Sequence, residues 1–419
     1  MLDPRERSTP VAAMVALFAV LALLASACSD GAVPSDETDA AEEPAGSGAI
    51  AIAALDGLSV VSGDGGSSTV VTDANPVAQP TWSRDGSRLL AVEFTSPTDL
   101  QTVVVAGEED AVTHPARRPY FFFSWSGDGS FVAGLGPGPG GTTLDILDSD
   151  GRPVSDDSLD AGSFYLAWEP GGDDLLIHRD ATLELVRDPT KLEDRSALGQ
   201  PGQLFLAPAW IPGTRDALIA APTSDGNRLV RIDVDTGEQT DLGPVSGGVG
   251  IVVSPDGSRA VLAHGGPAAA VDSIAISFPT QQSTVAESAV TASTEIIDLV
   301  TNDRSPVSSE PSLWAEWSPD SESILMLQAR RDGEPGSEWV VWVEGRERPL
   351  GPSRLSQAFF RNFVPFSWQF VETPRLWSPG SDAIVYGGSD GTTPGIYVHR
   401  LAQDSPERIA DGDVAFWSP

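Results

Sequence analysis

The side chains that could carry out a chemical reaction are few and widely spaced in this sequence. One segment, Gly387–Gly391, matches the Gly-x-Ser-x-Gly pattern in which many hydrolases place a serine nucleophile. Such a nucleophile must stand on a sharp turn between a strand and a helix. Here the segment joins AIVYG to GIYVHR, two apolar runs that predict strands, so we interpret its glycines as hairpin residues. The four histidines are too far apart in sequence to form a helical zinc motif: His114, His178, His264 and His399.

Carboxylates are abundant, but none can be assigned to a reaction. Three Asp-x-Asp pairs stand in turns and lack the distal glutamate of a calcium loop, so we predict that they cap turns: Asp148/Asp150, Asp233/Asp235 and Asp411/Asp413. With 60 acidic residues in the chain, no pair stands out as the acid and base of glycoside cleavage. We therefore expect no catalytic residue, no resident metal and no cofactor, apart from adventitious calcium on so acidic a surface.

The balance of charges restricts the partners that the chain can bind. Its 419 residues include 60 acidic and 25 basic side chains, which gives a formal net charge of −35. A surface this negative repels phosphate backbones, so we expect no nucleic-acid partner. Hydrophobic residues make up 40% of the chain, which is enough for a globular core. The single cysteine, Cys28, excludes an intrachain disulfide.

Residues 1–27 are typical of an export signal. Arg5 and Arg7 precede an uncharged apolar run from Val11 to Ala25, which is shorter than the roughly 20 residues needed to span a bilayer. The string LLASAC that ends this segment resembles a bacterial lipobox, which implies that Cys28 is lipidated and anchors the chain to a membrane. Residues 28–48 carry this cysteine and an acidic stretch that predicts a disordered tether. We expect an exported protein, lipid-anchored on the extracytoplasmic side of the cell membrane.

One pattern recurs through the rest of the chain. An apolar or aromatic lead-in is followed by Trp-Ser, a Pro/Asp/Gly turn and an apolar run, as in TWSRDGSRLLAVEF and EWSPDSESILML. Successive copies are separated by 43, 43, 42, 43, 64, 60 and 40 residues. A period near 43 with about four short strands per repeat is typical of a propeller blade. We assign a structural role in the blades to the tryptophans at this position: Trp82, Trp125, Trp168, Trp210, Trp317, Trp377 and Trp417.

These repeats resemble the WD-like β-propeller repeats of the TolB-like family, whose units carry a W-S-P-D-G turn, and the resemblance covers about residues 49–419. It implies an all-β domain of four-stranded antiparallel blades and a role in binding other envelope proteins. Residues 49–80 predict three strands without a preceding Trp-Ser, and the chain ends on one strand, VAFWSP. Because the two pieces complete one blade, we predict eight blades, with the C-terminal strand joining the N-terminal strands to close the ring. Seven blades is the alternative.

Two repeats are longer than the others. Insertions at about 264–293 and 352–374 follow the second strand of one blade and the fourth strand of the next, and both positions emerge on the same face of a propeller. Loops added to a rigid scaffold often carry function, and arginines and aromatics are enriched at binding hot spots. We therefore predict a partner-binding face that comprises Arg117, Arg118, Tyr120, Arg354, Phe360, Arg361, Phe363 and Trp368. In the alternative interpretation, the aromatics pack between blades and the arginines pair with surface acids.

The sequence thus favours a non-catalytic scaffold that presents this face to a protein or peptide partner in the bacterial cell envelope. A small ligand in the central channel is a second kind of partner that the fold could accept. The competing hypothesis is an extracellular hydrolase or lyase that acts on carbohydrate or peptide at that channel. A pocket with converging carboxylates would favour the enzyme, and an apolar-aromatic surface with arginines would favour the scaffold.

Overall fold

The computed structural model describes residues 48–73, 75–96, 99–106, 110–162, 164–179, 182–198, 206–246, 248–264, 294–332, 336–369, 374–389 and 393–419. The predicted export signal, Cys28 and nearly all of the tether lie outside these residues, as does almost all of the first insertion. Within the described ranges, no helix is long and apolar enough to cross a membrane.

The strands form seven hydrogen-bonded sheets, and all their pairings are antiparallel. The first three sheets consist of β1 (Ala49–Ala54), β2 (Gly57–Ser62) and β3 (Ser68–Thr72) with β31 (Val414–Trp417); β4 (Val77–Trp82), β5 (Arg88–Ser96), β6 (Asp99–Ala106) and β7 (Val112–Pro115); and β8 (Phe122–Trp125), β9 (Phe131–Gly138), β10 (Gly141–Asp148) and β11 (Leu159–Ala161).

The next three sheets also have four strands each. They consist of β12 (Phe164–Trp168), β13 (Leu175–Arg179), β14 (Thr182–Val186) and β15 (Arg195–Leu198); β16 (Ala209–Trp210), β17 (Asp216–Thr223), β18 (Gly226–Asp233) and β19 (Gln239–Val245); and β20 (Gly250–Val253), β21 (Arg259–Ala263), β22 (Thr294–Asp298) and β23 (Arg304–Ser308).

The last sheet has seven strands: β24 (Ser312–Trp317), β25 (Ser323–Ala329), β26 (Ser337–Val343), β27 (Arg346–Leu355), β28 (Ala383–Ser389), β29 (Pro394–Arg400) and β30 (Glu407–Ala410). Its two halves are joined only where Arg354 and Leu355 at the end of β27 pair with Ser389 and Gly388 of β28. A separate bridge between Trp377 and Ile384 adds an inner strand to β28–β30. The ring therefore has seven hydrogen-bonded sheets. If the seven-stranded sheet is divided between β27 and β28, the ring has eight blade-like units.

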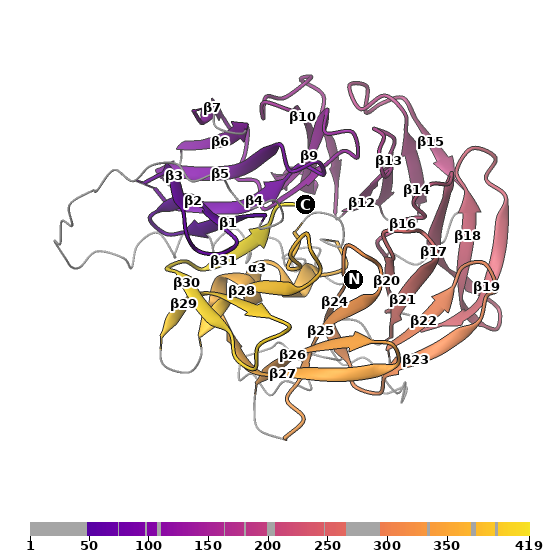
Figure 1. Ribbon diagram of the computed structural model, residues 1–419. Coiled ribbons are helices and arrows are strands. Elements are labelled where there is room, and N and C mark those ends of the chain that lie inside the picture. The colour runs from indigo at the N-terminus through magenta and orange to yellow at the C-terminus, as the bar shows by residue number, and fades with distance from the viewer. Residues whose placement is uncertain are drawn as a thin grey trace, which may run out of the picture.

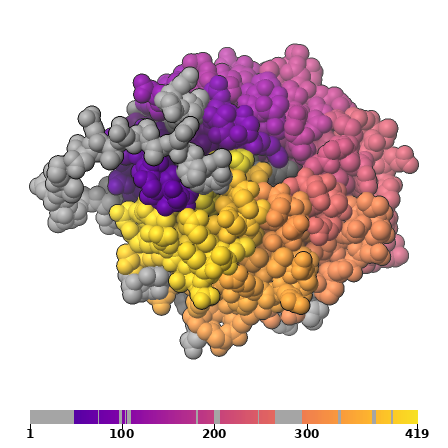
Figure 2. Space-filling model, viewed as in Figure 1, coloured from indigo at the N-terminus to yellow at the C-terminus, as the bar shows by residue number. Residues whose placement is uncertain are grey.

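The sheets stand side by side in a ring, which confirms the predicted all-β propeller fold (Figure 1). The first strands of neighbouring sheets contact one another, as do β31 with β4 and β20 with β24, so these strands surround the centre. The C-terminal strand β31 pairs with β1 through Ile50 opposite Trp417 and Ile52 opposite Ala415, as the sequence predicts. Figure 2 shows the yellow C-terminal part of the chain against the indigo N-terminal part.

The repeated tryptophans hold neighbouring units together. In six units the indole Nε1–H donates to a main-chain oxygen on the first strand of the preceding unit. For example, Trp125 donates to Thr81 and Trp168 donates to Ser124, each over 2.9 Å. A buried indole needs such a partner, because an unpaired buried N–H is destabilising. The repeat spacing therefore reflects a contact that each unit makes with the one before it.

The turn after each tryptophan is closed by its own serine and aspartate. Ser83 Oγ donates to Asp85 Oδ1 over 2.6 Å, and this hydrogen bond holds the pKa of the Asp85 carboxyl below its usual value. Gly86 follows with a φ of 70°, a conformation that favours glycine. Since antiparallel strands alternate in direction, these turns lie on one face of the ring. The second-to-third strand turns and the connectors between units lie on the other face, which we call the insertion face.

Candidate binding face and the central plug

The second insertion folds into a short helical segment, residues 356–369, which we call the plug. It contains helix α3 (Gln357–Asn362) and the 3-10 turn η1 (Val364–Phe366). Ser356 caps α3, because its Oγ accepts the Phe359 N–H over 3.1 Å. The same hydroxyl donates to the Asp413 carbonyl oxygen, and the Ser356 N–H donates to Gly387 O over 2.9 Å. These contacts fix the start of the plug between β28 and the connector that leads to β31.

The plug buries its aromatic side chains among strands that surround the centre of the ring. Phe359 is fully buried, and its ring centroid lies 5.5 Å from Trp314 on β24 and 6.4 Å from Phe416 on β31. Phe363 packs edge-on against Phe416 at 5.1 Å. One hydrophobic cluster includes these side chains and extends to Leu166 on β12. Burial of each large aromatic stabilises the fold by about 2–3 kcal/mol, so the plug is a packed part of the propeller.

The end of the plug reaches strands on the other side of the ring. Trp368 lies against Gly250 on β20 so closely that a Cβ there would meet the indole at 2.4 Å. The Gln369 side-chain amide accepts from Leu166 N–H and donates to Leu166 O, each over 3.3 Å. These are contacts with the first strands of two further sheets, in addition to β24 and β31. The plug therefore crosses the centre of the ring, where Figure 1 draws α3 inside the circle of sheets.

The tip of the plug remains accessible on the insertion face. Phe366 is 38% exposed, although its neighbours Phe363 and Val364 are buried. Pro365 is also exposed, and Arg361 on α3 is half-buried. Arg354, at the end of β27, is exposed. An exposed phenyl ring on a rigid support, with arginines on the adjoining segment, has the composition of a binding hot spot.

The eight residues of the predicted partner-binding face differ in their exposure to solvent. Tyr120 and Phe363 are each only 2% exposed and Trp368 is 8% exposed, so these three pack between units. Phe360 and Arg361 are half-buried, and Arg354 is exposed. Gln369 was not among the predicted residues. A lone glutamine beside an aromatic run gives no sequence signal that its side chain will hydrogen-bond to the main chain of a distant strand.

The two arginines near residue 120 bind a carboxylate inside their own sheet. Arg118 Nε donates to Asp145 Oδ2 over 2.6 Å, and the Asp145 side chain is fully buried. Tyr120 OH donates to the same carboxylate over 2.8 Å, and burial together with this negative charge raises the pKa of the Tyr120 hydroxyl. Arg117 pairs with Asp156 over 2.9 Å. The guanidinium groups thus fix the connector before β8, and their charge is largely compensated.

A second buried carboxylate lies on the inner strand next to the plug. Glu316 on β24 accepts from the Trp314 indole over 3.2 Å and from Leu376 N–H over 3.1 Å. Burial raises the pKa of the Glu316 carboxyl to about 7, although the nearby positive charge of Arg375 acts in the opposite direction. Burial therefore favours the protonated form of this carboxyl.

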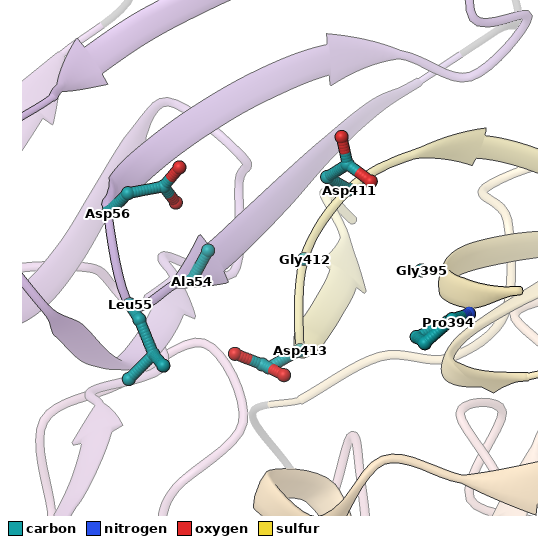
Figure 3. Close-up of a pocket in the computed structure, with 8 residues that line it drawn as sticks. All are labelled: Ala54, Leu55, Asp56, Pro394, Gly395, Asp411, Gly412 and Asp413. Atoms are coloured by element: carbon teal, nitrogen blue, oxygen red, sulfur yellow. The ribbon is translucent and has the colours of Figure 1, made fainter. Parts of the chain in front are cut away.

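A shallow hollow of about 360 Å³ opens on the insertion face between the first and last units (Figure 3). It is lined by Asp56 from the β1–β2 turn and by Asp411 and Asp413 from the connector before β31, with Leu55 and Pro394 at its sides. Asp411 forms an ion pair with Arg408. Across the described part of the chain, no group of three or more His, Cys, Asp or Glu side chains is arranged to hold a metal ion.

The other motifs singled out in the sequence serve turns and strands. Asp148 Oδ1 accepts the Asp150 N–H over 3.0 Å, and Asp233 Oδ1 accepts the Asp235 N–H over 3.0 Å, which confirms turn capping at both pairs. In the Gly-x-Ser-x-Gly string, Gly387, Gly388 and Ser389 belong to strand β28. The last two residues of that string lie outside the described ranges.

Comparison with known proteins supports the fold. No protein-family model matches the sequence, and no curated protein is similar to it in sequence. A dihydro-heme d1 dehydrogenase NirN is similar in structure, with a TM-score of 0.58 and 12% identity over 91% of this chain and 76% of that chain. A eukaryotic initiation factor is similar with a TM-score of 0.56 and 11% identity, over 90% of this chain and 99% of that chain.

A prolyl endopeptidase is similar with a TM-score of 0.53 and 15% identity, over 81% of this chain and 50% of that chain. TolB from Acinetobacter baumannii is matched with a TM-score of 0.37 and 13% identity, over 89% of this chain and 67% of that chain, which is too low to support a closer relationship. The similar proteins have unrelated activities, and each is less than 25% identical to this chain. Together with the ring of antiparallel sheets, they identify the chain as a β-propeller.

Proposed function

We propose that this protein is an exported lipoprotein whose propeller is a scaffold: it binds a protein or peptide partner on its insertion face, and this binding involves no catalysis. The lipobox-like string ending at Cys28 supports the membrane anchor, and the acidic tether would hold the propeller about 25 Å from the lipid surface. The resemblance of the repeats to TolB-like propellers favours a role in the cell envelope. The partner in this proposal is a folded protein or a peptide, since the net charge of −35 disfavours nucleic acid.

The observation that carries the proposal is the exposed tip of the plug. The insertion adds 17 residues to its repeat, and its Phe359, Phe363 and Trp368 are buried, yet Phe366 stays 38% exposed. The underlying α3 and η1 are held by packing and main-chain hydrogen bonds, so a partner would meet a preorganised surface. Preorganisation lowers the entropy cost of association and makes a single exposed ring effective.

The alternative function is an enzyme that acts in the central channel. The plug lies against inner strands from four sheets, so a substrate would have to displace it or enter from the opposite face. The described hollow on the insertion face is lined by aspartates, but it is shallow and one of them already pairs with an arginine.

The proposal is tested by crosslinking in cells that express the full chain, followed by affinity capture. The double variant Phe366→Ala, Arg354→Ala should lose the crosslinked partners, since it removes the side chains that are exposed on this face. The matched control is Val300→Ala, at a turn on the opposite face where Val300 is 85% exposed. If the double variant and the control capture the same partners as the unmodified chain, the insertion face is not the binding surface.

The membrane anchor is tested separately. Cys28→Ala should move the protein from the membrane fraction to the soluble extracytoplasmic fraction, because the chain has no other cysteine to lipidate. Mass spectrometry of the unmodified mature protein should show a lipid adduct on its first residue. Membrane association that survives Cys28→Ala would contradict the anchor.

A further inference from the structure

Three polar side chains on the unit β20–β23 form a connected row. Ser246 lies in the connector before β20, His264 follows β21, and Glu295 lies on β22. Ser246 Oγ is 3.2 Å from His264 Nδ1, and His264 Nε2 is 2.9 Å from Glu295 Oε1. The three residues are 18 and 31 positions apart, so only the fold brings them together.

The hydrogen bonds define which imidazole nitrogen carries the proton. The Ser246 main-chain N–H points at His264 Nδ1 over 3.3 Å, so Nδ1 acts as an acceptor. In the tautomer that fits this contact, Nε2 carries the proton and donates a hydrogen bond to Glu295. The basic nitrogen thus faces the serine hydroxyl, while the carboxylate orients the ring from the other side, which is the order of groups in a hydroxyl–imidazole–carboxylate triad.

Glu295 is held in the ionised form that this role requires. Its hydrogen bond to His264 and the Arg304 guanidinium, 2.8 Å from Oε1, keep the pKa of the Glu295 carboxyl below its usual value. Arg304 is itself fixed by the carbonyl oxygens of Leu242 and Pro244, over 3.0 and 2.8 Å. The carboxylate therefore has little freedom to turn away from the imidazole.

The row is accessible from the insertion face. Ser246, His264 and Glu295 are each only partly buried, and the His264 side chain retains 11% exposure.

We infer that Ser246, His264 and Glu295 form a nucleophilic centre that cleaves carboxylic esters, with Ser246 as the nucleophile, His264 as the general base and Glu295 as a positioning residue. This activity goes beyond the proposed binding function and does not depend on it. An uncharged ester is the favoured substrate class, because the net charge of −35 disfavours anionic ones.

The reaction proceeds by acyl transfer. Ser246 Oγ forms a bond to the ester carbonyl carbon, its proton passes to His264 Nδ1, and the carbonyl oxygen takes the electron pair of the C=O π bond. When the C=O bond re-forms, the bond to the alcohol oxygen breaks and His264 Nδ1 returns the proton to the alcohol. Water then attacks the acyl-serine by the same steps, which releases the carboxylic acid and regenerates the serine.

The experiment uses an alkyl fluorophosphonate, which forms a P–O bond with a nucleophilic serine and releases fluoride. The full chain should gain one adduct, located on Ser246 by peptide mass spectrometry, and Ser246→Ala should gain none. Ser87→Ala is the matched control, since Ser87 is exposed and hydrogen-bonded only to a carboxylate in the described structure. It should label like the unmodified chain.

The imidazole and the carboxylate are tested by rates of labelling. His264→Gln should slow labelling by at least about 100-fold, as expected for loss of a general base. Glu295→Gln should also slow it, and Glu295→Asp should restore part of the rate, while the melting temperatures of both variants stay close to that of the unmodified chain. No adduct on Ser246, or labelling at an unchanged rate in His264→Gln, would overturn the inference. Either result would leave partner capture through Phe366 unaffected.

Discussion

The indole Nε1–H of Trp82 donates to the carbonyl oxygen of Phe416 over 3.2 Å, although the two residues are 334 positions apart. The same bond joins Trp125 to Thr81 and Trp210 to Ala167 in consecutive units. The ring is therefore closed by the contact that the repeat uses everywhere else, with β31 pairing with β1 to complete the sheet. Because the closing unit is made from both ends of the described chain, it couples the first and last repeats.

Replacing Trp82 by phenylalanine should weaken this closure. The change removes the indole donor and leaves the buried Phe416 carbonyl oxygen without this bond. Trp417→Phe is a matched control, since the Trp417 indole is buried but its Nε1 has no hydrogen-bond partner in the described structure. Urea unfolding should show that Trp82→Phe lowers the free energy of unfolding by about 1 kcal/mol more than Trp417→Phe does. Equal losses would mean that the bond contributes nothing to closure.

The hydrogen bonds between the Gln369 side chain and the main chain of Leu166 should hold the end of the plug in place. Gln369→Ala removes two hydrogen bonds to the main chain of Leu166, each contributing about 1 kcal/mol. Hydrogen–deuterium exchange of residues 357–369 should accelerate by about 5- to 30-fold, with a smaller change in β12. Gln357→Ala, at an exposed position on α3, should leave the exchange unchanged. An unaltered plug in Gln369→Ala would show that aromatic packing alone fixes the segment.

Glu316 should make stability depend on pH. Because burial raises the pKa of its carboxyl from 4.5 to about 7, the folded chain binds this proton more tightly than the unfolded chain does. The contribution of Glu316 to the free energy of unfolding should therefore be fully present below pH 4.5 and be lost as the pH rises through 7. Glu316→Gln removes this loss, so its advantage over the unmodified chain should grow across that window, to roughly 3 kcal/mol at most.

The control for Glu316 is Glu322→Gln, at an exposed position in the turn between β24 and β25. Thermal unfolding of the three proteins at pH 5 and pH 8 gives the comparison. A difference between Glu316→Gln and the unmodified chain that stays constant with pH would contradict the elevated pKa of Glu316.

Replacing Arg118 should affect the stability of the fold, and replacing Arg354 should affect partner binding. Arg118→Ala leaves the buried Asp145 carboxylate without its closest cation and should lower the free energy of unfolding by about 3 kcal/mol or more. Arg354→Ala changes an exposed side chain and should stay within about 0.5 kcal/mol. Partner capture should fall only for Arg354→Ala once the folded fraction is taken into account. Loss of partner capture in Arg118→Ala but not in Arg354→Ala would mean that Arg118, and not Arg354, contacts the partner.

Most of the fold could be predicted from the repeat. One repeat illustrates this: its segments ALIAA (217–221), RLVRIDV (228–234) and QTDLG (239–243) overlap β17, β18 and β19, because apolar alternation and the Asp-Thr-Gly turn after RLVRIDV are local signals. The closure of the ring by β31 could be predicted because the repeat at residues 49–80 lacks its first strand and the chain ends on a single strand. The helix in the second insertion was not predicted, because its aromatic run has no clear helical period and is stabilised by contacts with β24 and β31 instead.

The candidate sites were harder to predict for a physical reason. Arginines and aromatics marked the plug, but sequence does not tell which of Phe359, Phe363 and Phe366 is exposed. That depends on which strands the plug crosses. The row of Ser246, His264 and Glu295 has no sequence motif, since its members come from a connector, from the position after β21 and from β22, and only the pairing of β21 with β22 brings the last two together.

The most direct test of the proposed binding face is site-specific photo-crosslinking in cells. A photoreactive residue is placed at position 366 on the tip of the plug, or at position 300 on the opposite face, where the native side chains are 38% and 85% exposed. We expect a discrete crosslinked partner at position 366 and none at position 300, even though position 300 is the more exposed. Crosslinks of equal yield at both positions, or a partner at position 300 alone, would contradict it.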